Sequence, residues 1–152
     1  MSMINKPEDS LPYHVRAAFR GFETALSRYL VTMDLPLSQF YILRLQWDED
    51  GNGQNNLAEK ACMTESVASQ VIQKMETSGL VTRKSVPEDA RKRRIFLTDK
   101  GRDLRGKIMS EGIKLSKKHA PDISREEMIT TISTLIKVRD AFDAFNAEDK
   151  RD

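Results

Sequence analysis

The chain has 152 residues, of which 39% are hydrophobic and 32% are charged, and its formal net charge is +2. This composition excludes an intrinsically disordered chain and fits a single helix-rich domain. One cysteine, no membrane-length apolar run and a polar N-terminus predict a cytoplasmic protein without a disulfide or a membrane partner.

Apolar residues recur at helical spacing in six segments of the chain. They predict helices over residues 12–33, 38–47, 56–62, 65–78, 99–118 and 125–145. Ser38 and Thr64 are expected to cap the second and fourth helices, and Gly79 is expected to end the fourth. The first and last helices carry more apolar residues than the core needs, so we expect them to pack against a second copy of the chain.

Two short β-like runs, residues 80–86 and 93–97, enclose a polar turn over residues 87–90. This order predicts a β-hairpin between the fourth and fifth helices. The expected fold class is therefore mainly α with a small β-hairpin (α+β).

The third and fourth helices are short and joined by a tight turn, as in a helix-turn-helix motif. In that motif the second helix enters the major groove of DNA. The inward face of the second helix here is expected to include either Val67 or Ala68. The polar side chains expected to meet base edges and phosphates are Thr64, Ser66, Ser69, Gln70 and Lys74. An ordinary amphipathic helix with a small polar face explains this pattern as well.

The predicted hairpin is strongly basic. Its cations are Arg83, Lys84, Arg91, Lys92, Arg93 and Arg94, interrupted by Glu88 and Asp89. A stiff ribbon holds these charges together, and a polyanion such as DNA would relieve their mutual repulsion. A solvated charged surface is the alternative interpretation.

Three runs of this segment closely resemble the wing of MarR-type transcriptional regulators. They are Leu80-Val81-Thr82-Arg83, Pro87-Glu88-Asp89-Ala90-Arg91 and Leu97-Thr98-Asp99-Lys100-Gly101. The resemblance implies a homodimeric winged helix-turn-helix protein, with one such unit in residues 1–152. It implies dimerisation helices over 12–34 and 120–146, a DNA-binding lobe over 37–98 and a long connecting helix over 98–119.

The resemblance also implies roles for individual residues on a pseudo-palindromic, double-stranded operator. Arg91 would enter the minor groove, with Asp89 holding its guanidinium in place. The implied wing contacts are Arg83, Asp89, Arg91, Lys92 and Arg93. The chain departs from the family pattern at Ala90, Gln70 and Val67, and Gln70 is expected to pair with adenine.

Members of this family typically act as repressors, and many release DNA when a small phenolic or aromatic acid binds. The implied pocket residues are Tyr13, His14, Arg16, Phe19, Arg20, Phe40 and Trp47. Core packing of the aromatic residues and surface ion pairs of the arginines are the alternatives.

Three other interpretations remain open at this stage. Cys62 lies just before the fourth helix and could serve as an oxidation sensor, although a buried cysteine acting as a small hydrophobe is the simpler interpretation. A winged fold could also bind protein instead of DNA. No enzyme and no cofactor are expected, because His14 and His119 lie far apart and no phosphate loop or nucleophile elbow is visible.

Overall fold

The computed structural model describes residues 6–86, 89–119 and 122–149, without the side chains of residues 86, 89–92, 113–119 and 149. Backbone contacts divide the chain into two compact units, residues 1–109 and 110–152. The first unit contains the predicted helix-turn-helix and hairpin, whereas the second contains the end of one long helix and the whole of the last helix.

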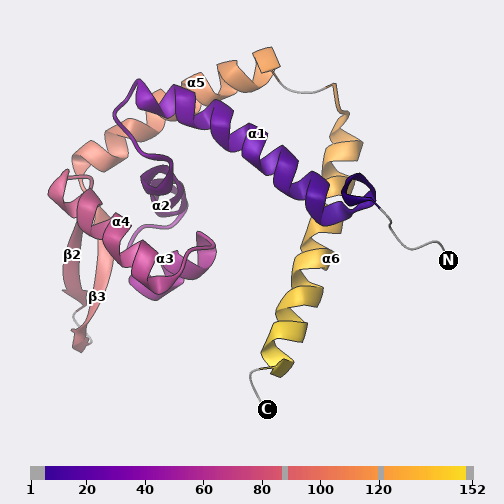
Figure 1. The fold of residues 1–152 in the computed structure, drawn as a ribbon. Helices are drawn as coiled ribbons and strands as arrows, with labels where there is room; N and C mark the ends of the chain where they lie inside the picture. The colour runs from indigo at the N-terminus through magenta and orange to yellow at the C-terminus, as the bar shows by residue number, and fades with distance from the viewer. Residues whose placement is uncertain (1–5, 87–88, 120–121, 150–152) are drawn as a thin grey trace. The chain divides into compact units, whose positions relative to one another are not determined.

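All six predicted helices and the hairpin are present (Figure 1). The first unit contains the 3-10 turn η1 (Pro7–Asp9), α1 (Leu11–Val31), α2 (Leu37–Asp48), β1 (Asn52–Gly53), α3 (Gln54–Lys60), α4 (Glu65–Thr77), β2 (Val81–Val86) and β3 (Asp89–Leu97). Helix α5 (Asp99–His119) starts in the first unit and ends in the second, where α6 (Arg125–Asp149) follows. The mainly helical fold class with a small β wing is confirmed.

The core of the first unit is formed by side chains of α1, α2, α3 and α4, the sheet and the first part of α5. Its fully buried side chains include Leu30, Ile42, Leu43, Leu57, Ile72, Met75 and Ile95. On α4, Ala68 is fully buried whereas Val67 is 45% exposed, so Ala68 supplies the inward position that the sequence left open between the two.

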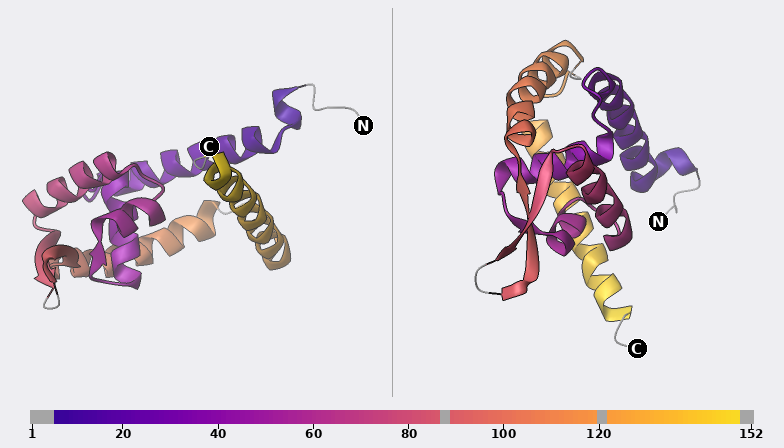
Figure 2. Two further views of the ribbon diagram at one scale, coloured as in Figure 1. Left: turned by 90° about the horizontal axis from the view of Figure 1, so that it is seen from below. Right: turned by 90° about the vertical axis from the view of Figure 1, so that its left-hand side faces the viewer.

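The sheet has three antiparallel strands in the order β1-β3-β2. Strand β1 pairs with β3 through Asn52 opposite Ile95 and Gly53 opposite Arg94. Strand β3 begins earlier than predicted, because Asp89 pairs with Val86 although the sequence favoured a turn there. Ala90 of that predicted turn also belongs to β3, and Pro87 and Glu88 lie outside the described residues. The hairpin extends past α3 and α4 of the same unit (Figure 2).

Polar side chains fasten the turn after α2 to the sheet. The buried Gln46 donates from Nε2 to the carbonyl of Ile95 at 2.6 Å, and its Oε1 accepts a bond from Asn52 Nδ2 at 3.0 Å. Asp50 Oδ1 accepts the backbone N–H of Leu97 at 2.9 Å, and Asp50 Oδ2 pairs with Arg102 at 3.0 Å. Because these bonds satisfy the polar groups, the turn can be partly buried without leaving these donors and acceptors unpaired.

The sequence Leu97-Thr98-Asp99-Lys100-Gly101 forms the joint between β3 and α5. Thr98 Oγ1 donates to the carbonyl of Gly79 at 2.6 Å and accepts the N–H of Gly101 at 3.2 Å, so Thr98 caps α5. The buried Trp47 donates from Nε1 to the carbonyl of Gly101 at 2.9 Å. The joint therefore ties α2, α4 and α5 together.

The sequence predicted the end of α4 correctly but not the start of α2. Gly79 has φ of +71° and ends α4 as predicted, with Leu80 N bonded to the carbonyl of Met75 at 2.8 Å. The prediction that Ser38 caps α2 is wrong. Pro36 is the N-cap, its carbonyl accepts the first helical N–H groups at 3.0 Å, and no side chain caps this end.

In the second unit, α6 begins with a capping box that the sequence analysis did not identify. Ser124 and Glu127 bond reciprocally, with Ser124 N to Glu127 Oε2 at 2.8 Å and Glu127 N to Ser124 Oγ at 3.2 Å. The bonds from Ser124 lower the pKa of Glu127, because they favour its charged form. The start of α6 is thus stabilised by bonds between residues close in sequence.

The close packing at Gly101 gives a stability prediction. A β-carbon at this position would collide with the backbone carbonyl oxygen of Leu80 and lie 3.1 Å from Leu97 Cδ2. Because the obstacle is backbone, Gly101→Ala should lower the free energy of unfolding by about 1–3 kcal/mol.

Gly106, on the same helix, is the matched control. No atom lies within 4 Å of a β-carbon there, so Gly106→Ala should raise the free energy of unfolding by up to about 1 kcal/mol. Urea denaturation of both variants measures the difference, and equal stabilities would contradict the assignment of a steric role to Gly101.

Candidate nucleic-acid interface

Helices α3 and α4 pack together as a helix-turn-helix pair. The turn between them is closed by Cys62, which has φ of +53°, and by a bond from Met63 N to the carbonyl of Ala58 at 2.9 Å. This left-handed residue ends α3 at Lys60, two residues earlier than predicted. The first turn of α4 is fixed by Thr64, whose Oγ1 accepts the N–H of Val67 at 3.3 Å.

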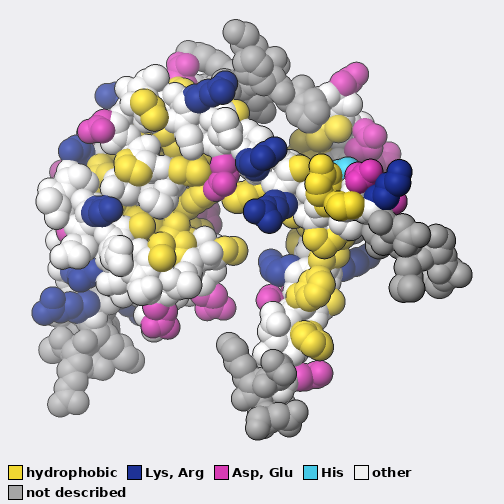
Figure 3. Space-filling model, viewed as in Figure 1, with side chains coloured by type: hydrophobic (Ala, Val, Ile, Leu, Met, Phe, Trp, Pro, Cys, Tyr) yellow, Lys and Arg dark blue, Asp and Glu magenta, His cyan; other side chains and the backbone are white. Residues whose placement is uncertain are grey.

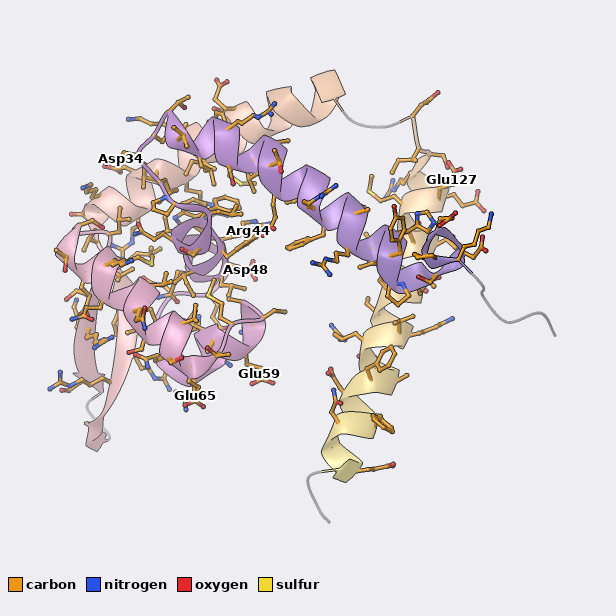
Figure 4. All side chains as sticks on the ribbon, viewed as in Figure 1. Asp34, Arg44, Asp48, Glu59, Glu65 and Glu127 are labelled. Carbon is orange, nitrogen blue, oxygen red and sulfur yellow. The ribbon has the colours of Figure 1, made fainter. Side chains whose placement is uncertain are left out.

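The outward face of α4 carries the predicted base-contacting residues. Thr64, Ser66, Gln70 and Lys74 are exposed, and Ser69 is half-buried. Gln70 and Lys74 also line an open hollow of about 370 Å³ together with Gln73, Thr77 and Ser78. The acidic Glu65 points outward at the start of α4 (Figure 4), where the helix dipole favours a negative charge. The structure therefore brings all five predicted side chains to one helix.

The cations of the hairpin are not equivalent. Arg83 is half-buried, and its guanidinium pairs with Glu76 Oε2 at 3.3 Å and donates to Gln54 Oε1 at 3.1 Å. Lys84 is exposed but places its ammonium 5.5 Å from the centre of the Phe96 ring. Arg83 thus joins β2 to α3 and α4, and whether it also contacts phosphate stays a prediction.

Arg93 and Arg94 are exposed and line a second hollow of about 760 Å³ beside β1 and α3. Basic side chains are visible at the hairpin of the first unit in Figure 3. The predicted contacts Asp89, Arg91 and Lys92 belong to β3, but their side chains lie outside the described residues. Their roles in the minor groove stay predictions.

The predicted ligand-pocket residues occupy two kinds of position. The five on α1 (Tyr13, His14, Arg16, Phe19 and Arg20) are all exposed. Phe40 is half-buried and Trp47 is buried, with their ring centres 6.3 Å apart and nearly perpendicular. Trp47 is therefore a core residue whose N–H is already bonded, whereas Phe19, at 52% exposure, is not part of the core. Neither of the two hollows above is lined by any of these seven residues.

Helix α1 meets α2 through a polar contact as well as through Leu26 and Leu30. Tyr41 on α2 donates to Glu23 Oε1 on α1 at 3.4 Å. Burial raises the pKa of Tyr41, and the nearby Glu23 carboxylate raises it further. The phenol therefore stays protonated and remains a donor. No sequence signal marked this pair, because the two residues lie on different helices.

Comparison with known proteins decides the assignment. The MarR family model matches residues 35–92, which contain the helix-turn-helix and most of the hairpin. The transcriptional regulator TtmR of Methylorubrum extorquens is 31% identical over 101 residues, which is 66% of this chain and 52% of TtmR. The chain belongs to the MarR family of DNA-binding transcriptional regulators. It spans about half the length of this first curated relative.

Solved MarR-type structures share the fold. CouR of Rhodococcus jostii RHA1, solved with p-coumaroyl-CoA, superposes with a TM-score of 0.79 at 20% identity and covers 89% of this chain and 95% of CouR. MepR of S. aureus, solved with DNA, gives 0.75 at 22% identity and covers 87% of this chain and 98% of MepR. The MarR assignment agrees with the prediction that the chain is not an enzyme.

Other classes of site find little support within the described residues of this MarR chain. In that part of the chain no three His, Cys, Asp or Glu side chains could jointly hold a metal ion. No helix among the described residues is both long enough and apolar enough to cross a membrane.

The expectation that Cys62 is buried is wrong. Its side chain is exposed, because the left-handed turn that closes α3 directs it away from the core of this MarR lobe. Sequence reasoning left the exposure of Val67 undecided and missed the use of Arg83 within the fold. The signal for Arg83 was present, since Glu76 and Gln54 are complementary partners, but only the fold brings the three together.

The engagement of Arg83 gives a second prediction. Arg83→Gln removes the ion pair with Glu76 and should lower the free energy of unfolding by about 1 kcal/mol, since both partners are partly buried. Arg83→Lys should restore only part of this, because an ammonium cannot reproduce the fork of the guanidinium.

The control is Arg93→Gln on the same hairpin, where the side chain is exposed and the free energy should change by less than about 0.5 kcal/mol. Thermal or urea unfolding of the three variants measures this. An equal loss in the Arg83 and Arg93 variants would mean that the Glu76 contact contributes nothing.

Proposed function

We propose that the chain is a dimeric, sequence-specific repressor that binds a pseudo-palindromic DNA operator and is released by a small aromatic or phenolic acid. The observation that carries the proposal is one compact unit that presents the polar face of α4 beside a basic hairpin. An outward helix with hydroxyl, amide and ammonium groups suits base edges and phosphates. A projecting basic ribbon gains binding free energy by releasing counterions from DNA.

Exposed apolar side chains support the dimer. Residues of α1 such as Phe19 and Phe22 are more than half exposed, at 52% and 58%. In the second unit, large apolar side chains are also exposed along α6 (Figure 3), namely Met128, Ile129, Ile132, Leu135, Ile136, Phe142 and Phe145. Surfaces of this extent are rare on monomers, and a second copy of the chain would cover them. Two lobes related by a two-fold axis would then meet two half-sites, about one helical turn of DNA apart.

The wing supplies the proposed minor-groove contact. Arg91 reaches the narrow groove and Asp89 orients it, as the MarR resemblance implies, with Lys92 and Arg93 on the neighbouring phosphates. Ala90 stands where many relatives carry another arginine, so this wing depends more heavily on Arg91.

Salt-dependent binding to duplex DNA tests the proposal. The logarithm of the affinity should fall linearly with the logarithm of salt concentration, with a slope of about −0.9 for each phosphate neutralised. Arg91→Ala should cost about 1–3 kcal/mol of binding free energy on a selected duplex.

The matched control is Arg44→Ala on α2, whose exposed side chain points away from the hairpin (Figure 4) and should leave the affinity unchanged. Fluorescence anisotropy at several salt concentrations measures both variants. The absence of binding to any duplex at low salt would reject the repressor and favour a winged module that binds protein.

The effector part of the proposal concerns the α1 residues Tyr13, His14, Arg16 and Arg20. All four are exposed in the single chain, so a pocket that includes them needs further walls, which a second copy would supply. A cation beside an aromatic ring suits a carboxylate attached to a phenyl ring. CouR, which holds p-coumaroyl-CoA, shares this fold and so makes a ligand compatible with it.

Oxidation of Cys62 is the second candidate signal. Its side chain is exposed and lies just before α4, the proposed recognition helix that enters the major groove. Purified protein on its selected duplex would be treated with a panel of aromatic acids and, separately, with hydrogen peroxide. Release by an acid, equal in wild type and Cys62→Ser, is expected. Release by peroxide that Cys62→Ser abolishes would instead identify the oxidation sensor.

A further inference from the structure

Val67 is an apolar side chain on the polar face of the recognition helix. It is 45% exposed, whereas Ala68, Val71, Ile72 and Met75 of the same helix are buried. Valine is a weaker helix former than most residues, so neither core packing nor helix propensity accounts for it at this position. A single exposed valine is ordinary on a protein surface, but this one lies on the face of α4 that also presents Ser66 and Gln70, where it offers DNA an apolar contact.

The position of Val67 is well fixed. Its N–H is bonded to the Thr64 hydroxyl in the first turn of α4, and a β-branched side chain keeps essentially one rotamer in a helix. Gln70 lies three residues further on and is exposed on the adjoining part of the same face. A rotamer-restricted apolar group and an exposed amide thus lie within one helical turn of each other on the outward part of α4.

The major-groove edge of DNA offers one apolar feature, the C5-methyl group of thymine. A valine cannot hydrogen-bond to any base edge, so among the four bases thymine, with its methyl group, offers it the largest apolar contact. Residues three apart on a helix rise by about 4.5 Å, which is more than one and less than two base-pair spacings of about 3.4 Å. The two side chains therefore lie within reach of neighbouring steps of the duplex.

We propose that Val67 is a specificity-determining residue that contacts the methyl group of a thymine next to the adenine read by Gln70. This inference rests on the proposed function, because it requires α4 to enter the major groove. It also accounts for a helix that has no arginine on its reading face among the described residues, since a thymine–adenine step needs no such donor.

Removal of single methyl groups from the DNA tests the contact. A duplex would first be selected from a random library with the wild-type protein, and each of its thymines would then be replaced in turn by uracil, which lacks only the methyl group. At one thymine of each half-site, the wild-type affinity should fall about fourfold, the ratio expected for burying one methyl group.

Variants of the protein link that loss to the side chain. Val67→Ala should bind the parent duplex about as weakly as wild type binds the uracil duplex, and should no longer distinguish the two. Val67→Thr retains one methyl group and should keep part of the discrimination. Gln70→Ala should lose the preference for adenine at the adjoining position only.

Arg44→Ala again serves as the control, because its exposed side chain on α2 points away from the hairpin (Figure 4) and the substitution should leave every affinity unchanged. If Val67→Ala responds to every uracil substitution as wild type does, the inference is overturned while the proposed function stands. If no duplex is selected at low salt, the proposed function fails and the inference fails with it.

Discussion

The carbonyl group of Leu80 is the point on which the DNA-binding lobe depends. It accepts the N–H of Thr98 at 3.1 Å and lies against the α-carbon of Gly101, so the first turn of α5 meets the start of β2 with no side chain between them. The carbonyl of Gly101 itself accepts the indole N–H of Trp47. One close backbone contact therefore sets the angles between α2, the hairpin and the long helix, and with them the position of the recognition helix relative to the wing.

Much of this lobe could be predicted from local sequence because its signals are local. Thr64 and Thr98 cap helices within three residues of themselves, and Gly79 supplies the left-handed end of α4. Helical spacing of apolar residues marked the buried face of α4 apart from one position. The family motif covered the joint at Gly101 without giving its reason, which is the Leu80 carbonyl.

The remainder could not be predicted because it depends on residues distant in sequence. Strand β1 has two residues in a turn-like stretch, and it exists because β3 offers a partner more than forty residues away. Arg83 was expected on DNA, but Glu76 and Gln54 occupy its guanidinium in the fold. Cys62 was expected in the core, yet it closes a left-handed turn and is exposed. In each case tertiary pairing, and not residue type, decides the environment.

The short β1 strand leaves most of the hairpin with open edges. Among the described residues, β1 covers β3 only at Arg94 and Ile95, and β2 has no further strand beside it. Such edges present unpaired backbone groups on which another chain could add a strand. The arginines and lysines of β2 and β3 oppose that addition, since a second copy would bring the same charges alongside. The basic composition of the hairpin is thus a safeguard against aggregation during the time that the protein is not on DNA.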